Sequence, residues 1–503
     1  MGYSSDYPSV REWEFKASGY QAGSLVKFKG NIFVADYWAQ SEPGKKPKPE
    51  EGWALYDELY DITSNYGKLS HSQSSPKIVA YLPTWRDSEH FPYGDESKYR
   101  GLTHVIISFV MFSPSLSGQL DLTSVRNVES ISTEVVSAAK NHGVKVMVAV
   151  GGATDYAFVE LMSKIKSDES SPMLEIAADA IHQFVLAHNL DSVDLDLECW
   201  WDSEGNSEKD MGGRMKQDGP HPAGMGLSLL AKRLRKIMPD KLISAAVFAT
   251  SWYGNNYDPG MYASLDWIGI MTYDLTGSWN NSPVGPHTAL YKIRDQSKYE
   301  SEQHGDWPSG GKKDNPIHSV EDALWYWTNP YYVNWQGRGA SIPRDKILLG
   351  VPIYGYDFSY AKDVDAQSGQ VPPGFKVIRY KDIVAQFPDA AYAPDANIKR
   401  TGSVARPTFS TAPGAYGFEH NIYYETPKSA IEKMDFIKNV GGQGIIIWEL
   451  TNDAVGTNSI VRSLSMVQGG LYEDAQINEF MDFFMEVAQM MALLSNEDIM
   501  KAT

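Results

Sequence analysis

The sequence predicts an α/β fold: a (β/α)8 TIM barrel with an α+β insertion between its seventh and eighth strands, preceded by a small all-β module. Eight apolar runs alternate with longer amphipathic stretches between residues 77 and 465, as in parallel strands joined by helices. Acidic residues close the fourth run, at the carboxyl end where such barrels place their chemistry. The 503 residues are also too many for one compact core.

Residues 1–60 are expected to form the small module. Short alternating runs separated by glycine turns, such as Val26–Gly30 and Phe33–Trp38, indicate two or three strands. So little chain cannot bury all of its aromatic rings, which leaves several exposed. Residues 61–76 are rich in Ser, Asn, Gly and Gln, a composition typical of a linker.

Residues 77–465 supply the strands and helices of the barrel. The predicted strands are Ile78–Leu82, Val105–Val110, Val144–Val150, Val193–Glu198, Leu242–Ala249, Trp267–Tyr273, Ile347–Ile353 and Gly444–Leu450. The helices predicted between them include Met173–Leu190, Met225–Met238, Ser319–Trp327 and Pro427–Val440. Thr426 followed by Pro427 indicates a helix start, because threonine caps a helix and proline suits its first turn.

Two segments exceed what a barrel needs. Residues 356–421 are far longer than an ordinary βα loop and contain the strand-like run Val377–Tyr380, so an inserted subdomain is expected on the catalytic face. Residues 466–503 form a C-terminal extension in which Ile477, Phe480 and Phe484 have the spacing of an amphipathic helix. That helix either packs on the barrel or docks a protein partner or second copy, and both interpretations stay open.

The composition restricts the class of partner. The 45 Lys and Arg residues against 63 Asp and Glu residues give a formal net charge of −18. This charge argues against a nucleic acid or an anionic membrane as partner, whereas a neutral polymer is compatible. The 14 Trp and 29 Tyr residues supply flat rings, which stack on sugar faces as well as pack in cores.

Redox, metal and membrane roles have little support in the sequence. Cys199 is the single cysteine, which excludes an internal disulfide and a cysteine-based metal site, so a small buried residue is its simplest interpretation. No apolar run reaches about 18 residues, so no membrane-spanning helix is expected. Residues 1–6 show neither the basic stretch nor the apolar core of a signal peptide. No metal and no cofactor are implied.

The stretch from Asp191 to Glu198 carries the candidate chemistry. On a strand, side chains two apart share a face, so Asp194, Asp196 and Glu198 would form a file of acids. Carboxylates spaced roughly 6–7 Å along a strand repel one another, so the pKa of at least one should be raised. A protonated acid beside ionised ones is what glycosidic bond cleavage requires. The alternatives are a solvated face, which the neighbouring internal strands disfavour, and a Mg2+ or Ca2+ site, for which no second acidic cluster is apparent.

The spacing Asp191-x-x-Asp194-x-Asp196-x-Glu198 resembles the signature of glycoside hydrolase family 18, the retaining chitinases and their relatives. The resemblance covers roughly residues 77–465 and implies a bacterial, deep-cleft type with an insertion. Further motifs agree in order along the chain: Ile78-Val-Ala-Tyr81 with Trp85, Ser108-Phe109, Val148-Ala-Val-Gly151-Gly152, Met271-Thr-Tyr273-Asp274 and Trp448-Glu449.

Three positions depart from the pattern of that family. Ala149 stands where serine is usual, Leu197 where an aromatic residue is common, and Tyr356 where many members carry arginine. None of these changes removes a catalytic group. They leave the preference for particular sugars along the cleft open.

The resemblance implies hydrolysis of β-1,4-linked N-acetylglucosamine polymers in which the substrate assists. Glu198 would protonate the glycosidic oxygen and later activate water, while the 2-acetamido carbonyl of the sugar attacks C1. Asp196 would hold the acetamido N–H, and Asp194 would share its proton. Tyr273 would orient the acetamido group, and Asp274 would hold the distorted sugar.

The resemblance also names binding residues. Trp448 would form the floor under the distorted sugar. Further candidates for lining the cleft are Met271, Tyr81, Trp85, Phe109 and Trp279. Packing in the core explains each of these equally well. Residues 11–59 resemble the chitin- and cellulose-binding modules of families 5 and 12, with Tyr37, where many members carry tryptophan, Trp38 and Tyr20 as stacking candidates. The alternative is that these rings belong to the core of the module.

Three functions remain in view. The first is a chitinase acting on chitin or chito-oligosaccharides, which would be secreted because the polymer lies outside the cell. The second is an endo-β-N-acetylglucosaminidase acting on glycoproteins, which the module and the insertion disfavour. The third is a non-hydrolytic chitin-binding protein, lectin-like, on the same barrel. Such relatives lose the last acid of the motif, whereas Glu198 is present.

Overall fold

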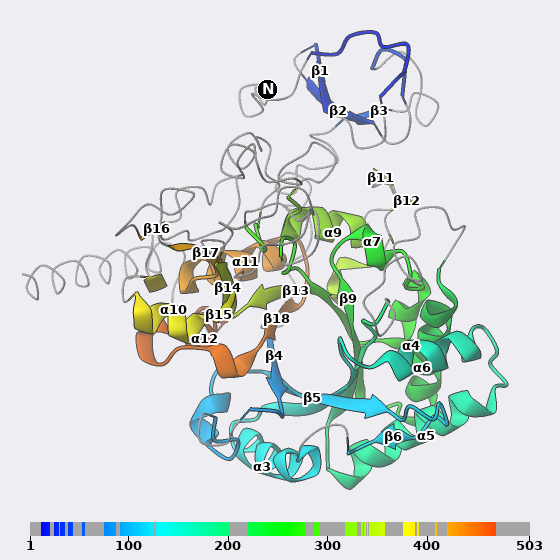
Figure 1. Cartoon of the computed structure of the whole chain (residues 1–503), viewed down its shortest axis with the longest axis vertical. Helices are drawn as coiled ribbons and strands as arrows, with labels where there is room; N and C mark the ends of the chain where they lie inside the picture. Colours follow the sequence, from blue (N-terminus) through cyan, green and yellow to red (C-terminus); the bar gives the residue numbers. More distant parts are fainter. Residues whose placement is uncertain are drawn as a thin grey trace, which may run out of the picture.

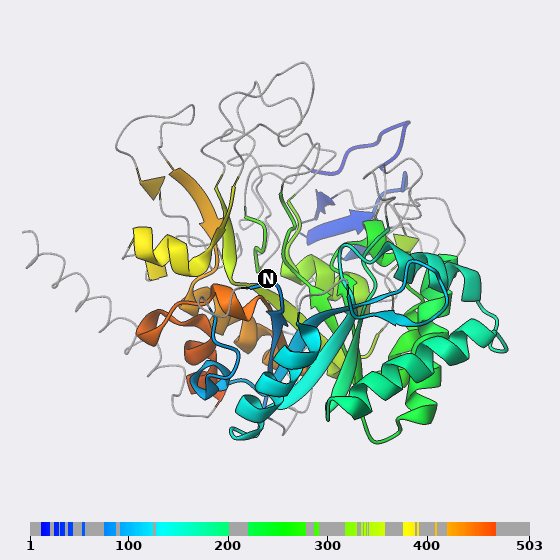
Figure 2. The same cartoon turned by 60° about the horizontal axis from the view of Figure 1, so that its bottom comes forward.

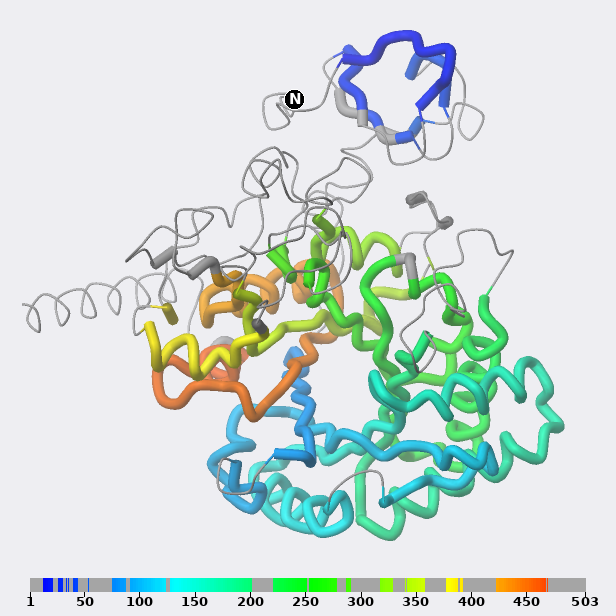
Figure 3. The backbone as a smooth tube through the Cα atoms, in the orientation of Figure 1, coloured from blue at the N-terminus to red at the C-terminus, as the bar shows by residue number. Residues whose placement is uncertain are grey.

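The structure is a computed structural model of the whole chain, and Figure 3 draws the described residues in colour. They are 12–20, 25–29, 31–35, 39–43, 53–55, 75–86, 91–123, 127–200, 220–277, 286–290, 317–328, 333–334, 337–338, 340, 342–357, 376–387, 390–391, 408–409 and 420–468. Several predictions concern residues outside this set: the linker, the C-terminal helix, Tyr37, Trp38 and Trp279.

Eight parallel strands close into a barrel (Figure 1). In chain order they are β4 (Lys77–Pro83), β5 (His104–Phe112), β7 (Lys145–Gly151), β8 (Ser192–Asp196), β9 (Leu242–Phe248), β10 (Trp267–Met271), β13 (Ile347–Pro352) and β18 (Gly444–Trp448). Each barrel strand pairs with the barrel strands that come before and after it in the sequence. The first strand, β4, pairs with both β5 and the last strand, β18, which closes the ring. The predicted barrel is confirmed.

Alternate residues of each barrel strand point to opposite faces, so they belong to two separate hydrophobic cores. On β4, Ile78, Ala80 and Leu82 belong to the large core between the strands and the surrounding helices. Val79 and Tyr81, which alternate with them, belong to a second core inside the barrel. Apolar residues are needed on both faces, because helices cover the outside while side chains fill the lumen.

Helices surround the barrel and follow the predicted ones closely (Figure 1). Thr426 and Ser429 form a capping box at the start of the last long helix, with Pro427 in its first turn, as its sequence indicates. The α-helices in this part are α3 (Val128–Lys140), α4 (Tyr156–Ile165), α5 (Pro172–Ala187), α6 (Pro222–Ile237), α7 (Ser251–Gly254), α9 (Val320–Thr328), α11 (Pro427–Asn439) and α12 (Ile460–Gln468).

Short elements complete the connections of the barrel. The strand β6 (Leu120–Asp121) pairs with β5 in the antiparallel sense, and β11 (Val333–Asn334) pairs with β12 (Gly337–Arg338). The 3-10 helices are η2 (Glu96–Tyr99), η3 (Pro259–Ser264), η4 (Arg344–Lys346), η7 (Leu450–Asn452) and η8 (Gly456–Asn458). Among the described helices, none is long and apolar enough to cross a membrane.

An antiparallel sheet lies between β13 and β18 in the sequence. Its strand order is β15 (Lys376–Arg379), β14 (Tyr354–Asp357), β17 (His420–Tyr424) and β16 (Thr408–Phe409), with α10 (Tyr380–Gln386) following β15. Figure 2 shows β14 and β17 side by side, with the yellow helix α10 next to them. The observed strands begin two residues before and end three residues after the predicted insertion.

The N-terminal residues form a three-stranded antiparallel sheet of β1 (Leu25–Phe28), β2 (Asn31–Ala35) and β3 (Trp53–Leu55). Its small core contains Tyr20, Val26, Ala35, Ala39 and Trp53. The predicted strands are present, whereas the boundary between this module and a linker stays a prediction.

Candidate active site

The acids of the fourth strand lie inside the barrel. Asp194 and Asp196 are 1% and 3% exposed, while Val193, Leu195 and Leu197 belong to the outer core. The strand is therefore buried on both faces, which rules out a solvated acidic face.

One predicted boundary is wrong: β8 ends at Asp196, so Glu198 lies two residues beyond the strand and is partly exposed. The Asp196 carbonyl still accepts a hydrogen bond from Gly152 N–H, at 2.8 Å, and this bond belongs to the pairing of Asp196 with Gly151 at which the β7–β8 ladder ends. Gly151 lies in the left-handed region with φ 118°, and a Cβ there would fall onto the Asp196 carbonyl. The close approach of β7 to the last residue of β8 thus depends on glycine.

Each carboxylate oxygen of Asp194 accepts a hydrogen bond from one hydroxyl group. Tyr81 Oη on β4 donates to Oδ2 at 2.8 Å, and Ser244 Oγ on β9 donates to Oδ1 at 2.5 Å. Burial raises the pKa of Asp194 to about 6, and the two hydroxyls oppose that rise. Ser244 was not singled out in the sequence; a serine within an apolar strand run was its only signal, since a buried hydroxyl needs a partner.

Asp196 and Glu198 interact and hold protons more strongly than isolated carboxyls. Burial raises the pKa of Asp196 well above its usual value, with the charges of Glu198 and Asp194 adding to the effect. Burial also raises the pKa of Glu198 to about 8, followed by the charges of Asp274 and Asp194. Both shifts have the direction expected from the sequence. At neutral pH this pair of carboxyls retains a proton that can be donated.

Tyr273 lies beyond the end of β10, and its side chain is buried beside the acids. The charges of Glu198 and Asp196 act on its phenol, although burial is the larger cause of the raised pKa of Tyr273. The preceding residue anchors this segment, because Thr272 Oγ1 donates to the Gly350 carbonyl at 2.9 Å. Met271, the last residue of β10, is 9% exposed and also lines the barrel lumen.

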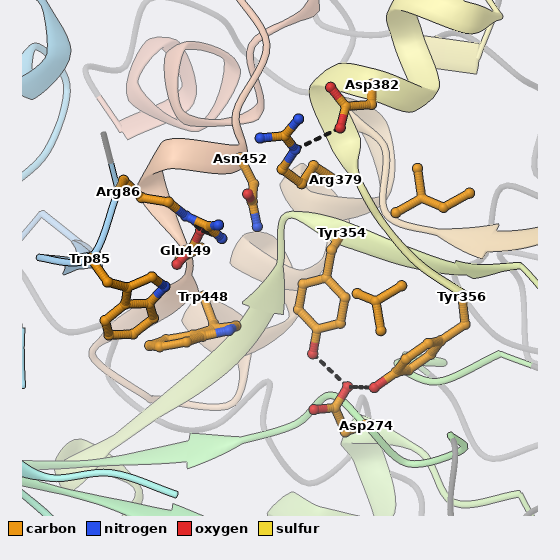
Figure 4. Close-up of a pocket in the computed structure, with 12 residues that line it drawn as sticks. Trp85, Arg86, Asp274, Tyr354, Tyr356, Arg379, Asp382, Trp448, Glu449 and Asn452 are labelled. Atoms are coloured by element: carbon orange, nitrogen blue, oxygen red, sulfur yellow. Dashed lines mark hydrogen bonds and ion pairs between the residues drawn. The ribbon is translucent and has the colours of Figure 1, made fainter. Parts of the chain in front are cut away.

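Asp274 accepts hydrogen bonds from two phenols that the sequence did not identify as site residues. Tyr354 Oη and Tyr356 Oη both donate to Asp274 Oδ1 at 2.5 Å, as Figure 4 shows. Asp274 has φ 54°, and His287 Nδ1 lies 3.6 Å from the same carboxylate oxygen. The two tyrosines lie two positions apart on β14, and this i, i+2 spacing was the only sequence signal that their side chains share a face.

Aromatic rings collect around Trp448 at the end of β18. Phe109 stacks on Trp448 with centroids 5.9 Å apart and planes 22° apart, and the Tyr81 centroid lies 5.8 Å away. Trp85 stacks on Phe109 at 6.1 Å and is 48% exposed, so it offers a ring face to solvent. The structure thus brings together the predicted aromatic candidates within the described residues, with Phe109 buried among them.

A cleft of 560 Å³ leads away from Asp274 and Trp448. Figure 4 shows its lining, in which Arg86 pairs with Glu449 at 2.5 Å and Arg379 pairs with Asp382 at 2.6 Å. Neither charged pair was predicted: Arg86 and Glu449 meet only through the tertiary fold, whereas Arg379 and Asp382 form a local i, i+3 pair at the start of α10. The cleft is lined by Trp85, Arg86, Asp274, Tyr354, Tyr356, Val377, Ile378, Arg379, Asp382, Trp448, Glu449 and Asn452.

The structure corrects the assignment of Tyr20 as a sugar-stacking residue. Tyr20 is 8% exposed, and its ring packs against Trp53 with centroids 5.2 Å apart. Its hydroxyl donates to the Glu14 carbonyl at 2.9 Å. Tyr20 is therefore part of the core of the module, because a ring this buried presents no open face to a sugar.

The part of the chain that the structure describes contains no set of side chains that could bind a metal ion. No three His, Cys, Asp or Glu side chains there are arranged to hold an ion. Cys199 is fully buried, and its Sγ lies 3.6 Å from the Gly152 carbonyl.

A barrel with buried acids at the end of its fourth strand and a cleft lined by aromatic rings is an arrangement typical of glycoside hydrolases. Residues 77–453 match the profile described as glycosyl hydrolases family 18. The chain belongs to this family.

Individual relatives agree with this assignment. A chitinase-like effector of Moniliophthora perniciosa is 25% identical over 420 residues, which cover 76% of this chain and 86% of that protein. An endochitinase of Manduca sexta is 24% identical over 414 residues, covering 76% of this chain and 64% of the endochitinase. The crystal structure of Ostrinia furnacalis Group IV chitinase matches the fold with a TM-score of 0.56 at 18% identity, covering 78% of this chain and 100% of that chain.

Proposed function

We propose that this protein is a retaining chitinase that cleaves β-1,4-linked N-acetylglucosamine polymers with assistance from the substrate. One arrangement carries the proposal: the partly exposed Glu198 follows the buried Asp194 and Asp196, and burial together with the charges of Asp274 and Asp194 raises the pKa of Glu198 to about 8. A general acid at neutral pH needs such a raised pKa, since an ordinary glutamic acid has lost its proton.

Glu198 donates its proton to the glycosidic oxygen as the bond to C1 breaks. The 2-acetamido carbonyl of the same sugar attacks C1, which gives an oxazolinium ring and releases the leaving sugar as an alcohol. Glu198, now ionised, takes a proton from water as the water opens that ring. Two displacements at C1 retain the anomeric configuration, so no second nucleophilic carboxylate is required.

Asp196 and Asp194 stabilise the positive charge of the oxazolinium. Asp196, the last residue of β8, lies between Asp194 on the strand and Glu198 beyond it, so it can accept a hydrogen bond from the acetamido N–H while a proton moves within the file. Asp194, held by Tyr81 and Ser244, remains fixed at the base of the file. A fixed negative charge in a buried site stabilises a developing cation without reorganisation of solvent.

The remaining residues orient the sugar. Tyr273 directs the acetamido group, and Trp448 supplies a flat surface beneath the ring; Tyr273 belongs to the core inside the barrel and Trp448 packs against it, which supports these roles. Asp274, fixed by two phenols, is positioned to accept a hydrogen bond from the distorted sugar. Residues of β14, β15 and α10 line one part of the cleft and add to the surface that a sugar chain can contact.

Product analysis tests the proposal. The wild-type protein should cut chito-oligosaccharides and colloidal chitin to short oligomers, whose initial anomer is β by nuclear magnetic resonance. Release of intact glycans from a glycoprotein, with chitin untouched, would replace this function by that of an endo-β-N-acetylglucosaminidase. Tight binding of chito-oligosaccharides without any turnover would make the protein a chitin-binding lectin.

The same proposal extends to the N-terminal module and to the place of action. An insoluble extracellular polymer requires a secreted enzyme, and residues 1–60 would hold that polymer. Their removal should weaken retention on insoluble chitin and leave the turnover of soluble oligomers unchanged. Equal retention of both forms on chitin would contradict the role of the module.

A further inference from the structure

The segment that carries Glu198 extends past the strand ladder, yet its carbonyl groups are hydrogen-bonded. The Asp196 carbonyl accepts from Gly152 N–H at 2.8 Å, and the Glu198 carbonyl accepts from Trp200 N–H at 2.7 Å. Both contacts are made by backbone groups of this segment or of the adjacent β7 end. The carbonyl between them, that of Leu197, is bonded instead by a side chain.

Tyr257 supplies that side chain from the connection after α7. Its Oη donates to the Leu197 carbonyl at 2.8 Å and accepts from Trp200 Nε1 at 3.3 Å. The rings of Tyr257 and Trp200 meet edge to face, with centroids 5.1 Å apart at 87°. One hydroxyl therefore holds the residue before Glu198 and the residue two places after it. Burial raises the pKa of Tyr257 well above its usual value, so the hydroxyl keeps its proton.

The backbone that presents Tyr257 is itself fixed by the start of α6. His221 N–H donates to the Asn256 carbonyl at 3.0 Å. A Cβ on Gly224 would fall onto the same carbonyl, so the helix and this backbone are in direct contact. Trp200 also packs edge to face on His221, with centroids 5.7 Å apart. The hydroxyl of Tyr257 thus reaches the loop of Glu198 from a backbone that α6 contacts directly.

We infer that Tyr257 is a positioning residue for the general acid: its hydroxyl, through the Leu197 carbonyl and the Trp200 indole, holds the loop at which Glu198 delivers its proton. The inference rests on the proposed function of Glu198. Tyr257 is 1% exposed and belongs to the core between the strands and the helices, so its ring is covered by protein. Its contribution is geometric, and a displacement of about 1 Å at a reacting group can cost about 10²-fold in rate.

Tyr257→Phe tests the inference, because it removes one oxygen and keeps the ring that packs on Trp200. We expect kcat on a chromogenic or fluorogenic chito-oligosaccharide to fall 10- to 100-fold with KM within about twofold of wild type. The alkaline limb of the kcat profile should move to lower pH, because a loosened loop lets water reach Glu198 and weakens the burial that raises the pKa of Glu198.

Tyr424→Phe is the matched control. Tyr424 is also a buried phenol whose hydroxyl donates to a backbone carbonyl, that of Ala390, at 2.7 Å. Both variants should lose a similar amount of thermal stability, but only Tyr257→Phe should lose kcat and shift the pH profile.

The outcomes separate the inference from the proposed function. If the wild-type protein is active and Tyr257→Phe has the same kcat and pH profile as Tyr424→Phe, the role of Tyr257 is overturned and the proposed function is not. A loss of activity in Tyr257→Phe that matches its unfolded fraction would also overturn it. A wild-type protein without turnover would overturn both the proposed function and the inference.

Discussion

Ser244 donates to Asp194 from the strand on one side of β8, and Ala149 faces Asp194 from the strand on the other side. The register pairs Asp194 with Ser244 on β9 and with Ala149 on β7, and the hydrogen bond from Ser244 Oγ is 2.5 Å long. Ala149 is the position where a serine was expected. The acid file therefore receives its second hydroxyl from β9.

Ser244→Ala should lower kcat about tenfold, because a hydrogen bond to a charged group contributes about 1.5–3 kcal/mol. The loss of the hydroxyl should also raise the pKa of Asp194, so the acid limb of the rate profile moves to higher pH. The double variant Ser244→Ala/Ala149→Ser offers a hydroxyl from the other side and should recover part of the rate. Steady-state kinetics from pH 4 to 9 would show these effects. Equal kinetics of Ser244→Ala and wild type would contradict the assignment.

The pH dependence of the wild-type enzyme should be bell-shaped. The reaction needs Glu198 protonated, so kcat should fall as the pH rises through a value of about 8. It also needs negative charge in the file, so kcat should fall as the pH drops below about 6, where Asp194 takes up a proton. An alkaline limb near about 4.3, the pKa of an ordinary glutamic acid, would contradict the raised pKa of Glu198 on which the proposal depends.

Tyr356→Phe should reduce kcat/KM about tenfold by removing one of the two phenols on Asp274. Tyr354→Phe should do the same, and the double variant should lose more than the product of the single effects. The reason is that each phenol on Asp274 Oδ1 partly compensates for the loss of the other. Kinetics of the four proteins give this comparison. Strict additivity, or no effect of either change, would argue against a shared role.

Lys433 in α11 forms a fully buried ion pair with Glu425, and its ammonium group also donates to Thr288 Oγ1. Lys433→Met should destabilise the protein by about 3–5 kcal/mol, because Glu425 would remain as a buried charge without its cation. The double variant Lys433→Met/Glu425→Leu should recover most of this loss. Urea unfolding of both variants measures the difference. A single variant as stable as the double would contradict the argument.

The placements that the sequence predicted correctly are those that depend on a single strand. The alternation of acids and apolar residues on β8 was enough to place Asp194 and Asp196 opposite the outer core. Contacts between elements were not predictable in the same way. Ser244 meets Asp194 only through the register of β8 with β9, which neither strand specifies alone.

Tyr20 and Tyr257 illustrate the same limit. A tyrosine near glycine turns has the sequence pattern of a surface ring, but Trp53 on β3 covers Tyr20. The contact of Tyr257 with the Leu197 carbonyl joins residues 60 positions apart. Loop geometry of this kind follows from packing of α6 against the connection after α7, which local residue patterns do not show.

The kinetics and binding of Glu198→Gln test the central claim most directly. The amide keeps the shape of the side chain but cannot act as the acid, and acid–base catalysis by one group contributes about 10²–10⁴ in rate. We expect kcat on chito-oligosaccharides to fall by at least 10²-fold while the affinity for the oligosaccharide, measured by calorimetry, stays within a few fold. Hydrolysis within tenfold of the wild-type rate would contradict the role of Glu198 and with it the proposed enzyme.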